Sequence, residues 1–231
     1  MLSREAGVGN MKWALWLVPW VLGFGLLGAR LAFPVETFRA RFMLEQGPVE
    51  LGTVVILIAA LALALRRAFT TGQTLQRVWL TVFAAGCFYF AGEELSWGQH
   101  LLGWETPEAI AALNDQQETN LHNMSSWLDQ KPRLALELWI VIGALLALGR
   151  AALKRSPLAD PWRWMWPGLP CVSAGLAVLL FRLPERLADV WSAAAAAPFD
   201  IRLAELQELL IAVHLLTYAW FFAARGNRPS A

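Results

Sequence analysis

Residues 203–224 read LAELQELLIAVHLLTYAWFFAA, and this stretch determines the fold class that the sequence predicts. It is predominantly apolar, and about 20 such residues suffice to cross the hydrocarbon core of a bilayer as one helix. Three ionisable residues, Glu205, Glu208 and His214, lie within it. Because ionisable groups are costly inside a bilayer, they mark positions that face the interior of a bundle or a water-filled cavity.

Five more apolar stretches precede this one, so the sequence predicts an all-α, polytopic transmembrane bundle of about six helices. We expect these helices near residues 11–33, 49–65, 75–102, 134–153, 161–183 and 203–224 of a single integral membrane domain that covers residues 1–231. The composition agrees, because 57% of the residues are hydrophobic and only 16% are charged, a balance that soluble domains do not show. Arg4 and Lys12 precede the first stretch as in a signal peptide, but its length and Pro19 favour a retained helix.

The charge distribution predicts the partners and the orientation. A net charge of +1 gives no basic surface for nucleic acid, so the lipid bilayer is the expected partner. With the N-terminus placed inside, the inner segments hold eleven basic residues and two acidic ones. The basic ones are Arg4, Lys12, Arg66, Arg67, Arg77, Arg150, Lys154, Arg155, Arg163, Arg225 and Arg228. Because positively charged loops stay cytoplasmic, we expect both termini in the cytoplasm and the chain in a bacterial inner (plasma) membrane.

The longest predicted connection is an outer loop at residues 103–133. Loops of this length without a domain of their own tend to be functional. Thr106 and Pro107 have the character of a helix cap and first turn, so we expect a short interfacial helix that starts there.

The third predicted helix continues beyond its apolar part as EELSWGQH, residues 93–100. If it stays helical, Glu93, Ser96, Trp97 and His100 share one narrow face, which then carries a carboxylate, a hydroxyl and an imidazole. Adjacent acids at a membrane boundary favour a functional role for this face. The alternative is a helix end that is merely wetted by lipid head groups.

Carboxylates on three predicted helices reach a similar depth in the outer part of the bilayer, judged from a rise of about 1.5 Å per residue. They are Glu93, Glu137, Glu205 and Glu208. We expect them to face one another inside the bundle, with Arg182 and Arg202 as candidate counter-ions. Functional and structural roles both stay open for these residues and for His214.

The outer loop contains a second polar cluster, NDQQETNLHN, at residues 114–123. Glu118 and His122 are four residues apart, a spacing that lets two side chains on a helix share a metal. Imidazole with carboxylates suits zinc, manganese or iron, and a carboxylate can instead orient the histidine as a general base. The alternative is an asparagine-rich loop whose side chains cap its own turns.

The segments GEELSWGQ (92–99), WETPE (104–108) and ETNLHN (118–123) resemble the motif of an uncharacterised family of bacterial polytopic membrane proteins. The resemblance implies no activity, but it singles out the residues that match. They are Glu93, Glu94, Ser96, Gln99, Glu118, Asn120 and His122. In that family the position of His100 is often arginine, which argues against a metal role for His100.

A looser similarity is to the alkaline-ceramidase-like membrane hydrolases, whose zinc site combines Ser-x-x-x-His, a later aspartate and His-x-x-x-His on the last helix. Ser96 and His100 match the first element, and Asp115 stands for the second. The last predicted helix contains only His214, without a second histidine four residues away. A zinc site of that type is therefore incomplete in this sequence.

The sequence favours a membrane-embedded enzyme that acts at the outer interface on a lipid-like substrate, by metal-assisted or acid-base hydrolysis or transfer. Its candidate catalytic residues are Glu93, Glu94, Ser96, Gln99 and Asn120, and its candidate ligands for a divalent metal are Glu118, His122 and His100. Gln99 and Asn120 would orient polar groups of the substrate, and the helix that starts at Thr106 would act as a lid.

Two alternatives stay open. One is a transporter or proton-coupled channel in which Glu137, Glu208 and His214 form a relay through the bundle. The other is a non-catalytic membrane subunit whose loop, residues 93–133, binds a partner protein.

Overall fold

The computed structural model describes residues 2–44, 46–112, 114, 119–120, 126–153, 163–191 and 196–224. These residues form helices, turns and loops and no strand, which confirms the predicted all-α class. Four of the helices are long and apolar enough to cross a membrane. A fifth crossing results if one further helix and the bent segment that follows it count as a single span. The sequence predicts about six such helices, and the described residues therefore supply four or five.

Among the described residues, six long helices make up the bundle. They are α1 (Leu2–Ala32), α3 (Pro48–Thr70), α4 (Thr74–Glu94), α7 (Ser126–Ala152), α8 (Leu169–Val190) and α9 (Leu203–Ala224). The short helices are α2 (Val35–Phe42), α5 (Gln99–Leu102) and α6 (Glu108–Ala111), with 3-10 turns at Ser96–Gly98 and Arg163–Met165.

The predicted bounds differ most from the structure at α8. The sequence predicts a helix over residues 161–183, but α8 begins at Leu169, after Pro167 and Gly168, and continues to Val190. Its second half carries Arg182, Glu185, Arg186 and Asp189, which explains why α8 does not count among the helices apolar enough to span. The apolar run therefore marked only the first two thirds of this helix.

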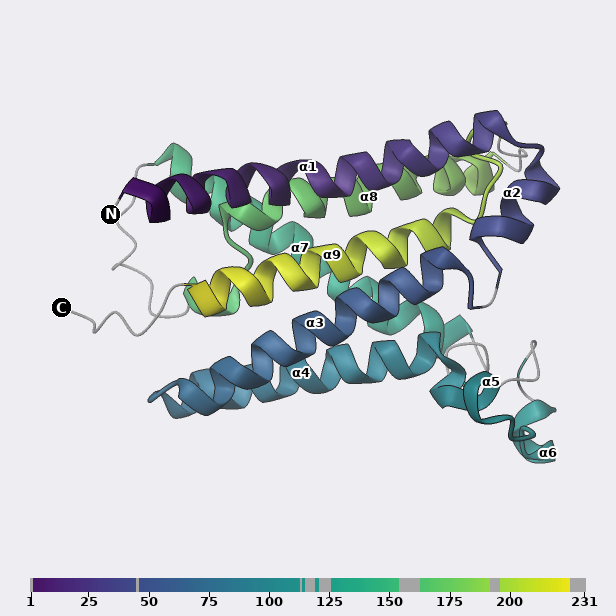
Figure 1. Ribbon diagram of the computed structural model, residues 1–231, viewed down its shortest axis with the longest axis horizontal. Helices are drawn as coiled ribbons and strands as arrows, with labels where there is room; N and C mark the ends of the chain where they lie inside the picture. The colour runs from purple at the N-terminus through teal and green to yellow at the C-terminus, as the bar shows by residue number, and fades with distance from the viewer. Residues whose placement is uncertain are drawn as a thin grey trace.

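α9 is the central helix of the bundle (Figure 1). Of the residues in its most apolar part, 72% are buried, against 33% or less in the three other candidate spans. α9 packs against α3 and α8, while α4 packs on α3, and α1 and α7 pack on α8. A helix with apolar residues on all sides belongs in such an enclosed position.

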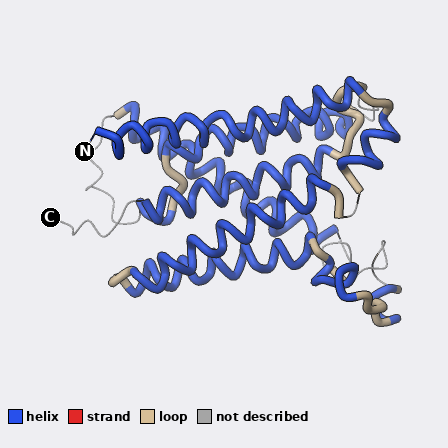
Figure 2. The backbone as a smooth tube through the Cα atoms, in the orientation of Figure 1, coloured by secondary structure: helices blue, strands red, loops and turns tan. Residues whose placement is uncertain are grey.

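The two ends of the bundle differ, as Figures 1 and 2 show. The start of α1 and the end of α9 lie at one end, and α2, α5 and α6 lie at the opposite end, which we call the loop end. Because α4 ends and α9 begins at the loop end, Glu94, Glu205 and Glu208 are all carried to that end.

Asp200 joins three segments at the loop end. Arg30 of α1 donates two hydrogen bonds to its carboxylate, from Nε to Oδ1 at 2.8 Å and from Nη2 to Oδ2 at 2.5 Å. Arg39 of α2 donates from Nη2 to its backbone carbonyl at 2.7 Å. The hydrogen bond from Arg30 is the main reason why the pKa of Asp200 lies below its ordinary value, and this double contact ties α1 to the connection before α9.

This ion pair predicts a pH-dependent loss of stability. Because the pKa of Asp200 is lowered in the folded protein, its contribution is fully present above about pH 4, the ordinary range for aspartate, and disappears as the pH falls through the lowered value. We expect Asp200→Asn to lower the melting temperature in detergent by about 2–4 °C at pH 7 and progressively less below pH 4. Circular dichroism checks this, with Glu36→Gln as a control because the Glu36 side chain is 84% exposed. A difference that does not depend on pH would contradict the assignment.

Candidate functional site

The helix predicted over residues 75–102 is interrupted. α4 ends at Glu94, and the segment that follows is bent by 70° relative to it. Ser96, Trp97 and Gly98 all have positive φ, at 45°, 56° and 88°, so the chain makes a left-handed turn there. Such a conformation costs roughly 1–2 kcal/mol for each residue other than glycine. The expectation that Glu93, Ser96, Trp97 and His100 share one helical face is therefore wrong.

Trp97 folds back onto the end of α4. Its Nε1 donates a hydrogen bond of 2.7 Å to Oε1 of Glu93, which is buried. A Cβ atom on Gly92 would lie 2.8 Å from the indole ring, so only glycine permits this approach. The ring also meets Phe88 and Tyr89 at centroid distances of 5.9 and 6.0 Å. These contacts offset the cost of the turn and engage the Glu93 carboxylate.

Three predicted catalytic residues hold the outer loop to this turn. Nδ2 of Asn120 donates to Oγ of Ser96 at 3.1 Å, and Nδ2 of Asn114 donates to Oδ1 of Asn120 at 2.8 Å. The backbone N–H of Thr119 donates to Oε1 of Gln99 at 2.6 Å. Ser96 and Asn120 are buried, so the structure gives all three residues contacts that organise the loop.

The predicted metal ligands are placed only in part. His100 lies exposed on α5. Glu118, His122 and Asp115 lie outside the described residues, so the metal site predicted in the loop stays a prediction. The helix predicted from Thr106 corresponds in position to α6, and its role as a lid also stays a prediction.

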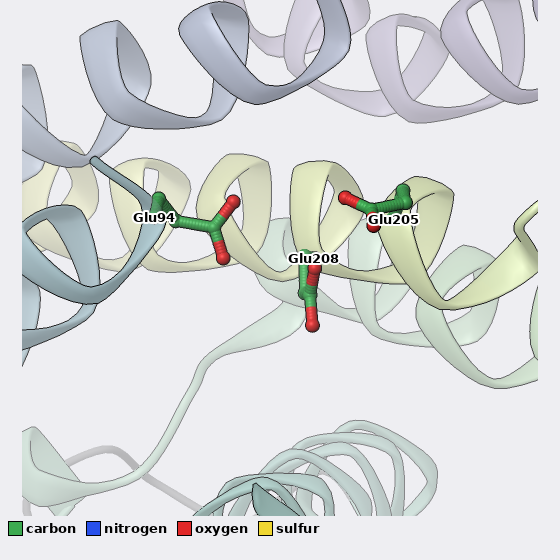
Figure 3. Close-up of side chains that lie close together, drawn as sticks. All are labelled: Glu94, Glu205 and Glu208. Atoms are coloured by element: carbon green, nitrogen blue, oxygen red, sulfur yellow. The ribbon is translucent and has the colours of Figure 1, made fainter. Parts of the chain in front are cut away.

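Glu94, Glu205 and Glu208 form a carboxylate cluster between α4 and α9. Carboxylate oxygens of the three residues all lie within 4.8 Å of one another, and the side chains are half-buried. Figure 3 shows the Glu94 side chain reaching from α4 toward Glu208 on α9, with Glu205 beyond it. The sequence predicts Glu93 in this place, but consecutive residues of a helix point about 100° apart, and it is Glu94 that faces α9.

The three carboxylates differ in their partners. Arg133 of α7 donates to Oε1 of Glu208 in an ion pair, and Arg202 lies 3.6 Å from Glu205. Among the described residues, none forms a hydrogen bond or an ion pair with the Glu94 carboxylate. Carboxylates this close repel one another, and a proton or a cation held among them relieves the repulsion. Glu94 is therefore the member of the cluster that lacks a direct ion pair with a described arginine.

Glu137 belongs to a separate site, although the sequence predicts it within the cluster. Its Oε1 accepts hydrogen bonds from Nη2 of Arg186 at 2.6 Å and from Nε2 of Gln207 at 2.7 Å. The predicted counter-ion Arg182 pairs instead with Glu185. Glu137 is buried, so these contacts stabilise the junction of α7, α8 and α9.

His214 is packed inside the bundle. It is 1% exposed, and its ring meets Trp139 edge to face at a centroid distance of 5.8 Å. An ideal Cβ on Gly175 would lie 3.5 Å from its Nδ1. These contacts are those of a packing residue, and the predicted relay through Glu137, Glu208 and His214 stays a prediction.

A cavity of about 440 Å³ lies between α4, α7 and α9, and nothing in the sequence pattern predicts it. One end is polar, with Glu93, Glu94, Arg133 and Glu208 in its wall. The rest is lined almost entirely by apolar side chains. They include Trp79, Val82, Phe83, Cys87, Phe90, Leu136, Trp139, Ile211 and Leu215. The carboxylate cluster therefore lies at the polar end of an apolar chamber.

The lining residues of this cavity that are exposed at the protein surface all lie on α4 and α7. Val82, Gly86 and Tyr89, at one stripe of α4, line the cavity and are also exposed at the surface. Ala135 on the facing side of α7 is exposed in the same way. The exposed wall residues mark a lateral slot, which runs along the helices beside the polar end.

Two sets of residues are candidates for holding a metal. One is the loop set that the sequence predicts, Glu118, His122 and His100. The other is the carboxylate cluster, whose oxygen ligands suit magnesium, manganese or calcium better than zinc. The sequence signal for the second set was the Glu93-Glu94 pair, together with two glutamates three residues apart on the last helix.

Comparison of the chain with protein-family models, with characterised proteins and with solved structures finds no significant match to any of them.

Proposed function

We propose that this protein is a membrane-embedded enzyme that hydrolyses, or transfers a group from, a lipid-like amphiphile bound in the cavity between α4, α7 and α9. The observation that carries the proposal is the amphiphilic character of this cavity. An apolar chamber of about 440 Å³ ends at Glu94, Glu208 and Arg133, within the size range of small-molecule sites. An amphiphile would place its chain in the chamber and its polar part beside the carboxylates.

The proposed setting is a bacterial inner membrane with both termini cytoplasmic. The excess of basic residues in the inner segments supports this orientation. The loop end, and with it the polar end of the cavity, would then lie at the non-cytoplasmic interface. In this setting the slot between α4 and α7 faces the hydrocarbon core, so a lipid enters sideways without leaving the bilayer.

The chemistry that we propose centres on Glu94. Acting as a general base, Glu94 takes a proton from a water molecule, whose oxygen adds to the carbonyl carbon of an ester or amide. The bond to the leaving group then breaks, and the leaving group takes the proton from Glu94. Arg133 stabilises the negative charge that develops on the carbonyl oxygen. Glu208 holds Arg133 in position through their ion pair.

A divalent metal in this cluster would be held by the carboxylates of Glu94, Glu205 and Glu208, and it would supply Lewis-acid activation of water. If the cluster holds such an ion, purified wild type contains one divalent ion per protein and Glu94→Gln loses it, because that change removes one anionic ligand of three. Inductively coupled plasma mass spectrometry of purified wild type, Glu94→Gln, His122→Ala and Glu36→Gln measures this. If only His122→Ala loses the bound metal, the metal site lies in the loop. If wild type is active without bound metal, the acid-base mechanism is the one that remains.

A direct test of the proposal uses purified protein in lipid nanodiscs and two p-nitrophenyl esters, the dodecanoate and the acetate. We expect release of p-nitrophenol from the dodecanoate and little from the acetate, because only the long chain fills the apolar chamber. A panel of ester- and amide-linked lipids, followed by mass spectrometry, then identifies the bond class. If well-folded protein consumes none of these compounds, the proposed function is wrong.

A further inference from the structure

At the end opposite the carboxylates the cavity has an aromatic floor. Trp79 and Trp139 line it, and the buried Tyr218 packs behind them. The rings of Trp79 and Trp139 are 6.3 Å apart between centroids, and those of Trp139 and Tyr218 are 5.0 Å apart. The three residues come from α4, α7 and α9, which are the helices that enclose the cavity. Beside them, Phe83 meets Tyr218 at 5.1 Å.

Hydrogen bonds fix this aromatic floor in place. Nε1 of Trp79 donates to the Tyr218 hydroxyl at 2.7 Å, and that hydroxyl donates to the backbone carbonyl of Trp164 at 2.8 Å. Nε1 of Trp139 donates to the backbone carbonyl of Met165 at 3.1 Å. Every polar group of the three rings is thus held, so a bound chain cannot displace them at low cost.

The depth of the chamber follows from helix geometry. Glu208 and Tyr218 are ten residues apart on α9, which corresponds to a rise of about 15 Å. Glu94 and Trp79, the floor residue on α4, are fifteen residues apart, which corresponds to about 22 Å. An alkyl chain whose polar end lies beside the carboxylates therefore meets the floor after about 15–22 Å.

We propose that the aromatic floor limits the length of the alkyl chain that the cavity accepts, so that Trp79 and Trp139 determine the chain-length specificity. The inference rests on the proposed function for the amphiphilic nature of the ligand. A chain in a bilayer is already in apolar surroundings, so a longer chain gains nothing from transfer into the protein. A short chain leaves part of the chamber without contacts, and a long one must distort a packed aromatic layer.

The test measures binding rather than turnover. Protein in nanodiscs is equilibrated with alkyltrimethylammonium ions, and in a second series with monoacylglycerols, each from octyl to octadecyl chains. Native mass spectrometry then gives the fraction of protein that carries each ligand. Wild type is compared with Trp79→Ala, with the smaller change Trp79→Phe, and with Trp191→Ala. Trp191 is 71% exposed at the end of α8 and does not line the cavity, so it controls for the loss of an indole.

We expect wild type to prefer one chain length in at least one series, with chains longer than the optimum bound about tenfold more weakly. Trp79→Ala should move the optimum to longer chains, Trp79→Phe should move it less, and Trp191→Ala should leave it unchanged. Equal binding of all lengths by wild type, no binding of either series, or an optimum that no Trp79 variant moves would overturn the inference. If wild type shows a clear optimum of chain length but hydrolyses no ester, the inference about the aromatic floor holds and the proposed reaction is wrong.

Discussion

Glu94→Gln is expected to lower the rate of dodecanoate ester hydrolysis by about 10²- to 10⁴-fold, the range typical of a lost general base. The amide keeps the size of the side chain but neither takes up a proton nor supplies an anionic ligand. Glu94 is also the member of the carboxylate cluster to which no described residue gives a hydrogen bond or ion pair. Its carboxyl group is therefore available to a substrate, a water molecule or a metal.

The same substitution should not weaken the fold. Glu94 lies within 4.8 Å of two other carboxylates, and removal of one like charge reduces their repulsion. We therefore expect an unchanged or higher melting temperature in Glu94→Gln, measured by circular dichroism in detergent. Loss of activity together with retained stability separates a catalytic role from a structural one.

Two controls make this experiment decisive. Glu36→Gln changes an exposed carboxylate on α2 and should leave the rate unaltered. Glu93→Gln changes the neighbouring residue, whose Oε1 accepts the hydrogen bond from Trp97, and should act mainly on stability. Full activity in Glu94→Gln, or a selective loss of activity in Glu93→Gln, would show that the site has been assigned to the wrong glutamate.

The sequence predicts the helical class well because apolar runs in membrane proteins leave few alternatives. The predicted bounds of α9 are the observed ones, because that helix is enclosed over most of its length. The sequence misplaces the start of α8, where the apolar signal is continuous but Pro167 and Gly168 precede the helix. It does not indicate α2, whose mixed composition resembles a loop.

The candidate site is predicted less well, for reasons that are tertiary. The run 93–100 has no proline, so helical periodicity extends through it, and the left-handed turn depends on the tertiary packing of Trp97 on Gly92. That turn removes Ser96 and His100 from the face on which Glu93 was expected. Gly98 is the one local signal that pointed to a break.

The cavity itself has no sequence signature. Its wall comes from three helices that are distant in the chain, and its apolar residues have the same periodicity as ordinary packing residues. Arg133, the counter-ion of Glu208, follows Pro132 inside α7 and looks like the end of a loop in the sequence. Only the three-dimensional arrangement shows which apolar residues line the cavity and which are packed in the core.

Gly86→Leu provides the second large expected effect, because it fills the slot without disturbing the fold. Gly86 lines the cavity on α4, and a Cβ built on it has no neighbouring atom within 4 Å. The leucine side chain would extend into the open side between α4 and α7 and obstruct both the entry of a lipid and its chain. Leucine also favours the helix over glycine by up to about 1 kcal/mol, so stability should be retained or raised.

We therefore expect Gly86→Leu to reduce hydrolysis of the dodecanoate ester at least tenfold, with a normal melting temperature. Gly28→Leu on α1 is the matched control, because its Cβ also has no neighbour within 4 Å and it does not line the cavity. Binding of the alkyl series by native mass spectrometry shows whether the loss arises from exclusion of the chain. A Gly86→Leu protein that binds and hydrolyses like wild type would mean that the substrate does not occupy this chamber, since no chain could share it unchanged with an added leucine.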